Sequence, residues 1–174
     1  FRSGVVYNAQ AYRALLRMPL EAGKPEEPLF SVADADVLGV VQDEWNHAVV
    51  GANYADDKME YVYFDAERQA LEERLEKMFP GLTVHPVSAD VAHDAWIVET
   101  EGSRDPPTYY YLAADGEPVE IANSYPALKP NDLGEVKPYP YKARDGLDIS
   151  AYLTLPPGKD GKNLPVVVMP HGGP

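Results

Sequence analysis

The segment LPVVVMPHGGP, residues 164–174, points to one fold class more firmly than any other part of the chain. Its apolar run at residues 166–169 does not alternate with polar residues, as a strand with one face in water would. The run therefore predicts a strand covered on both faces, as in the centre of an α/β sheet. A loop opening with His171, Gly172 and Gly173 follows directly.

A hairpin precedes this apolar run. Residues 136–142 read as extended, Asp145 and Gly146 form a turn signal, and residues 147–155 alternate between apolar and polar side chains. A hairpin followed by a doubly covered strand is the way in which an α/β-hydrolase sheet starts.

Upstream, short runs of β-branched and aromatic residues alternate with clusters of Gly, Pro, Asp and Asn, which predicts antiparallel meanders. The predicted strands are residues 5–7, 14–18, 28–32, 37–41, 48–54, 61–64, 96–100, 108–112 and 118–122, and His85 lies in a further short strand. Sets of about four strands fit consecutive propeller blades better than a closed barrel.

One helix interrupts the strands. Residues 66–79 are strong helix formers with an apolar stripe, Asp65 can cap their start, and Pro80 and Gly81 end them. We expect this surface helix to pack on the neighbouring strands, with partner binding as the alternative. Residues 123–134 then read as a linker. It separates a unit at residues 1–134 from one at residues 135–174.

Composition excludes several classes of function. The formal net charge of −13 opposes binding to nucleic acid or to anionic membranes. No apolar segment is long enough to span a bilayer, which predicts a soluble protein, cytoplasmic or periplasmic, of undetermined compartment. The chain has no cysteine, and no sequence pattern typical of a metal site or a cofactor is present.

Residues 141–156 and 164–174 together resemble the entry into the catalytic domain of the prolyl oligopeptidase family, in its acylaminoacyl-peptidase or dipeptidyl-aminopeptidase-like branch. The preceding residues resemble the last blades of that family's β-propeller, including the helix after Phe64 and Asp65. The resemblance implies a mostly β chain in which about two propeller blades, and part of another, lead into the first strands of an α/β-hydrolase sheet.

The same resemblance implies a serine peptidase acting on short peptides, with Gly173, beside Gly172, as an oxyanion donor. His171 precedes the place of the nucleophile, whereas a triad His follows it, so His171 is expected to shape the loop. None of the six serines lies in Gly-x-Ser-x-Gly, so no triad residue is expected in these 174 residues. The chain is therefore expected to be an inactive piece of a larger enzyme, with the rest of that enzyme as a partner and self-association left open.

Two other functions remain open. An esterase of the same fold also carries His-Gly-Gly loops, although such enzymes usually have a helical cap in place of propeller strands. A non-catalytic β-propeller module would use His-Gly-Gly-Pro only as a turn. The aromatic residues of the strands serve either a peptide-binding surface or, as we favour, packing between strands: Trp45, Trp96, Tyr109, Tyr110 and Tyr111.

Overall fold

Strands and turns alternate along most of the chain, because β-branched and aromatic runs are punctuated by turn-forming residues. A computed structural model describes residues 2–7, 12–21, 27–56 and 58–170. Strand accounts for 41% and helix for 11%, which confirms the prediction of a mostly β protein. The strands form several antiparallel sheets, and none of those in the described residues closes on itself.

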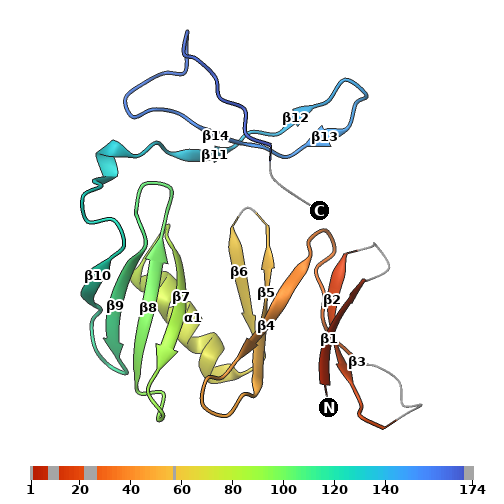
Figure 1. Cartoon of the computed structure of the whole chain (residues 1–174). Coiled ribbons are helices and arrows are strands. Elements are labelled where there is room, and N and C mark those ends of the chain that lie inside the picture. Colours follow the sequence, from red (N-terminus) through yellow and green to blue (C-terminus); the bar gives the residue numbers. More distant parts are fainter. Residues whose placement is uncertain (1, 8–11, 22–26, 57, 171–174) are drawn as a thin grey trace.

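Three of the sheets are meanders that stand side by side (Figure 1). The first sheet contains β1 (Arg2–Tyr7), β2 (Arg13–Met18) and β3 (Glu27–Phe30). The second contains β4 (Val37–Gln42), β5 (Val49–Ala55) and β6 (Met59–Tyr63). The third contains β7 (Thr83–Ala89), β8 (Ala95–Glu101), β9 (Thr108–Ala113) and β10 (Val119–Asn123). All nine predicted strands form, and the short strand around His85 is β7.

The predicted helix is α1 (Ala66–Met78). The Asp65 carboxylate accepts hydrogen bonds from the backbone N–H groups of Glu67 at 3.1 Å and Arg68 at 3.0 Å, so it caps the first turn as expected. The helix ends at Phe79, and Gly81 follows with φ 82°, a conformation that glycine adopts without strain. α1 contacts both β6 and β7, so it lies where the second and third sheets meet.

The core forms in two places. Around the third sheet, the helix stripe packs on the sheet as predicted, in a cluster of Leu75, Phe79, Val84, Trp96, Val98 and Leu112. Between the first and second sheets, a smaller cluster of Leu15, Val37 and Ala52 is covered by Leu29, Phe30 and Val40. Each apolar sheet face in these clusters is thus covered by a neighbouring element, which is the requirement for a stable layer.

The linker leads to a separate hairpin unit across one end of the sheets (Figure 1). The linker contains a 3-10 turn, η1 (Pro130–Asp132). The side chain of Arg104, in the loop between β8 and β9, binds this turn. Arg104 Nε donates to the Pro130 carbonyl and Nη2 donates to Asn131 Oδ1, both at 3.0 Å.

The hairpin forms as predicted around Asp145 and Gly146, and Gly146 has φ 90°. It consists of the pairs β11 (Val136–Pro138) with β14 (Tyr152–Thr154) and β12 (Tyr141–Lys142) with β13 (Asp148–Ile149). The continuous strand predicted at residues 147–155 is therefore split between β13 and β14. The facing strand carries Pro140 between the two paired segments, and a proline has no N–H to donate to the ladder.

The apolar run at residues 166–169 differs from the prediction. It forms no strand in the described structure, and its four side chains are 81–85% exposed rather than covered on both faces. The physical reason is that no described strand lies beside it to satisfy its backbone groups.

The substitution Leu75→Ala tests the helix packing. Leu75 is fully buried, so truncation should lower the free energy of unfolding by about 2–5 kcal/mol through lost burial and a residual cavity. Chemical denaturation measures the change. The matched control is Leu20→Ala, whose parent side chain is 69% exposed and whose effect should stay within about 0.5 kcal/mol. Equal effects of the two substitutions would contradict the packing described.

The substitution Arg104→Ala tests the attachment of the linker. Loss of both hydrogen bonds to η1 should increase the rate of proteolytic cleavage within residues 123–134 several-fold, because exposed connections are cut when they open. Limited proteolysis with mass spectrometry measures the rate. Arg144→Ala, in the exposed hairpin turn, is the control, and a linker cut no faster in Arg104→Ala than in this control would refute the role of Arg104.

Candidate functional site

The residues expected to form the oxyanion loop, His171, Gly172 and Gly173, lie outside the described residues. The structure describes the approach to them as far as Pro170, which is an extended and exposed segment. The structure therefore gives the position of the chain just before the loop and leaves the loop itself as a prediction.

A cleft of about 600 Å³ lies between the ends of the second and third sheets and the hairpin unit. Lys58 and Glu101 line it from the sheets, and Val136 and Tyr152 line it from β11 and β14. The cleft thus brings charged side chains of the sheets opposite apolar and aromatic side chains of the hairpin.

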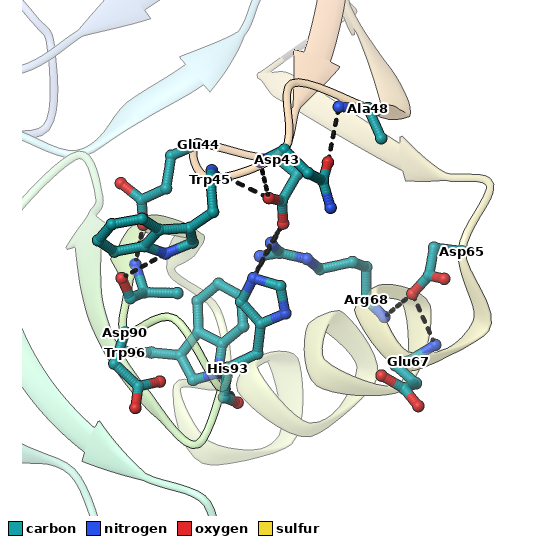
Figure 2. A network of polar contacts seen from close by, with 12 residues as sticks. Asp43, Glu44, Trp45, Ala48, Asp65, Glu67, Arg68, Asp90, His93 and Trp96 are labelled. Atoms are coloured by element: carbon teal, nitrogen blue, oxygen red, sulfur yellow. Dashed lines mark hydrogen bonds and ion pairs between the residues drawn. The ribbon is translucent and has the colours of Figure 1, made fainter.

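Among the described side chains, the densest polar cluster lies around Asp43, in the turn between β4 and β5. Asp43 is 2% exposed. One oxygen accepts hydrogen bonds from the backbone N–H groups of Trp45 and Asn46, both at 3.0 Å. The other oxygen receives Arg68 Nη2 of α1 at 2.7 Å and lies 2.9 Å from His93 Nε2, in the turn between β7 and β8 (Figure 2).

These contacts favour the ionised carboxylate. The backbone hydrogen bond from Asn46 makes the largest contribution, and those from Trp45 and Arg68 and the charge of His93 act in the same direction. Together they outweigh the opposing effect of burial and lower the pKa of Asp43 to about 2. Asp43 therefore remains charged across the physiological range.

The indole ring of Trp96 packs against two members of this cluster, Arg68 and His93. The Arg68 guanidinium lies over the Trp96 ring, 4.2 Å from its centroid, which is a cation–π contact. The His93 ring stacks on the same indole with centroids 5.6 Å apart. The three side chains come from α1, from the β7–β8 turn and from β8, so the cluster joins the second and third sheets through the helix.

A pocket of about 460 Å³ opens beside this cluster. Its described lining includes Asp43, Arg68, Arg74 and His93, but no Ser or Thr that could act as a nucleophile. Arg74 is occupied with backbone carbonyls, including a 2.8 Å bond to Gly116. Because Asp43, Arg68, His93 and Arg74 are paired with each other or with backbone, these four side chains serve to hold the sheets together.

The turn between β4 and β5 makes a second contact with the third sheet, through Glu44 and Trp45. Trp45 Nε1 donates to the Ala89 carbonyl at 3.2 Å, while the Glu44 carboxylate accepts from the Ala89 N–H (Figure 2). The second sheet thus satisfies both backbone groups of one residue at the end of β7, which is an edge strand of the third sheet. Covering an edge in this way blocks unwanted strand pairing.

The remaining aromatic residues are mostly occupied in packing. Trp96 is 7% exposed, and Tyr110 packs on Phe79 with ring centroids 4.9 Å apart. Tyr109 donates a hydrogen bond to Glu99 at 3.1 Å. Tyr111 and Trp45 keep about half of their surface exposed, at 44% and 52%. The preference for packing over a peptide-binding surface thus fits three of the five residues best.

The contact of His93 with Asp43 was not predicted from the sequence. The turns that carry the two residues resemble each other, but this similarity does not place His93 beside Asp43. Asp43 and Asp90 open equivalent turns, with His47 and His93 near their ends, and both histidines have φ 59°. Asp90 caps its own turn by accepting from the N–H groups of Asp94 at 2.8 Å and Ala95 at 3.1 Å.

No group of three or more His, Asp or Glu among the described residues is arranged to hold a metal ion. The helices that the structure describes include none with the length and apolar character needed to cross a membrane.

The substitution Asp43→Asn tests the cluster through pH. Because the folded-state pKa of Asp43 is about 2 and its ordinary value is 3.8, the stability that its charge supplies is present above about pH 4 and is lost as pH falls toward 2. Thermal melting should show a shallower acid loss in Asp43→Asn than in the parent chain. Asp115→Asn, at an exposed turn, is the control and should retain the parent slope. An unchanged slope in Asp43→Asn would contradict the assignment.

No protein-family model, no curated protein and no solved structure matches this chain. What the chain does must therefore be inferred from its own residues and from the resemblance of its sequence segments.

Proposed function

We propose that this chain is part of a serine peptidase of the prolyl oligopeptidase family that hydrolyses short peptides. In this proposal the three meander sheets are consecutive blades of a β-propeller. The hairpin and the apolar run are the first strands of the α/β-hydrolase domain, and the Ser, Asp and His of the triad come from a part of the enzyme beyond these 174 residues.

The observation that carries the proposal is the exposed run at residues 166–169. Four consecutive apolar side chains at 81–85% exposure are unusual on a protein surface, where large contiguous apolar patches mark contact sites. The same run has the composition of a doubly covered strand and leads directly into His-Gly-Gly-Pro. A strand that pairs on both sides in the complete enzyme accounts for both properties.

The hairpin unit supports the same reading. Several of its apolar and aromatic side chains are at least half exposed: Tyr139, Tyr141, Leu147 and Tyr152. Such a surface fits a sheet edge that is extended and covered by further strands and helices. The side-by-side meanders agree with propeller blades, in which each sheet covers the face of its neighbour.

The site residues have defined roles in this proposal. The N–H of Gly173, beside Gly172, donates to the oxyanion of the tetrahedral intermediate, and the lack of a Cβ allows the backbone to approach it. His171 shapes the loop. Loss of one such donor costs about 3–4 kcal/mol of transition-state stabilisation. The cleft of about 600 Å³ between sheets and hairpin supports access by short peptides.

A fluorophosphonate probe tests the proposal. The complete enzyme that contains this sequence should become covalently labelled at a serine, whereas the 174-residue chain should not, because it contains no Gly-x-Ser-x-Gly. Fluorescent gel analysis and peptide mapping read the result.

Substrates separate the alternatives. Faster hydrolysis of acyl-amino-acid or dipeptide amides than of simple esters supports the peptidase, and the reverse order favours an esterase. Labelling of the 174-residue chain would contradict the absence of the nucleophile. A complete protein that neither reacts with the probe nor cleaves either substrate class would indicate a non-catalytic propeller module.

A further inference from the structure

Glu72 stands at an unusual place in the helix. It lies on α1 one turn after Arg68 and about one turn before Leu75, the residues that anchor the helix to the Asp43 cluster and to the core. Its side chain is half-buried, and its Oε2 atom is buried with no hydrogen-bond partner among the described residues. A buried carboxylate oxygen without a partner is costly when charged.

The surroundings of Glu72 add to this cost. Burial, which has the largest effect, acts with the charges of Glu76 and Glu60 to raise the pKa of Glu72 to about 7. Lys58 acts in the opposite direction, but it is half exposed and lies 3.7 Å from Glu60.

The groups whose charges act on Glu72 are Glu76 on α1 and Lys58 and Glu60 before and on β6. Glu72 in turn acts on Tyr61 and Tyr63 of β6. Tyr61 stacks on His85 of β7 and is also affected by the charges of Glu99 and Glu101 of β8. Burial raises the pKa of both tyrosines, so they remain neutral at physiological pH and supply no compensating charge.

We propose that Glu72 is a protonation-dependent catch that holds α1 against β6, tight when the carboxyl is neutral and loosened when it is ionised. The neutral carboxyl stays in its buried position at a much lower desolvation cost than the charged form. The ionised carboxylate is driven toward water, and the helix carries Arg68 with it. Proton release at Glu72 thereby weakens the tie between the second and third sheets.

The direction with pH follows from linkage. A carboxyl whose pKa is raised in the docked helix above its ordinary value of 4.5 favours docking fully below about pH 4.5. Docking weakens as pH rises toward 7 and changes no further above that. The Asp43 contribution is lost only below about pH 4, so the two effects fall in separate pH windows. The catch is independent of the proposed peptidase activity.

Hydrogen exchange at pH 5 and pH 7.5 tests the proposal on the intact protein. After correction for intrinsic rates, protection of the amides in α1 should fall by up to about sixtyfold between the two values, the change in opening that a carboxyl pKa of about 7 in the docked helix and 4.5 in the open helix implies. Amides of β8 serve as an internal reference and should change far less. Glu72→Gln should remove the fall, whereas Glu73→Gln, an exposed neighbour on the same helix, should retain it.

A direct titration keeps the proposal testable if Glu72→Gln fails to fold. Carbon-13 labelling of the glutamate carboxyl groups should reveal one group with a midpoint near pH 7 in the unsubstituted protein. A helix whose protection does not depend on pH, a Glu72→Gln variant with the parent's fall in protection, or a Glu72 carboxyl that titrates in the ordinary range would each overturn the proposal.

Discussion

An antiparallel sheet with an apolar face has to be covered, and this requirement organises the structure. Leu75 of α1 covers the apolar face of the third sheet by packing with Trp96 and Leu112. Leu15 of β2 covers the apolar face of the second sheet. The polar contacts act around these apolar layers. Asp43 brings α1 and the β7–β8 turn to the second sheet, and Glu44 and Trp45 cover the end of β7.

Local signals explain how much of this fold could be predicted. Asp65 capping, the Leu stripe of α1 and the Asp145–Gly146 turn depend only on neighbouring residues, so the helix and the hairpin were predicted correctly. The division between β13 and β14 depends on Pro140 in the opposite strand, which a pattern within residues 147–155 does not contain. The contact of His93 with Asp43 joins residues 50 apart, and no local pattern places them together.

The run at residues 166–169 shows the other limit. Its composition predicts burial on both faces, but burial requires neighbours, and no described element supplies them. In the proposed peptidase this run would lie within a complete sheet, whereas the structure describes the segment without one. The peptidase proposal depends on this segment because its composition predicts burial while its side chains are exposed. Under that proposal, the exposed run at residues 166–169 lies where the propeller is followed by the hydrolase domain.

The two acidic residues of the sheet junction illustrate opposite effects of burial on a carboxyl. Asp43 receives backbone and side-chain donors, so its pKa falls to about 2, whereas an oxygen of Glu72 has no donor and the pKa of Glu72 rises to about 7. The same helix thus carries a permanent ionic tie through Arg68 and, one turn later, a group that titrates near neutrality.

The central claim is that residues 166–169 form a strand in the sheet of an α/β-hydrolase domain. An experimental structure of the whole protein that contains this sequence tests it most directly. The account predicts that this run pairs with a strand on each side and that the N–H of Gly173 points toward a serine at a strand-to-helix turn. A run that remains unpaired and exposed, or that lies at the edge of a sheet far from any serine nucleophile, would contradict it.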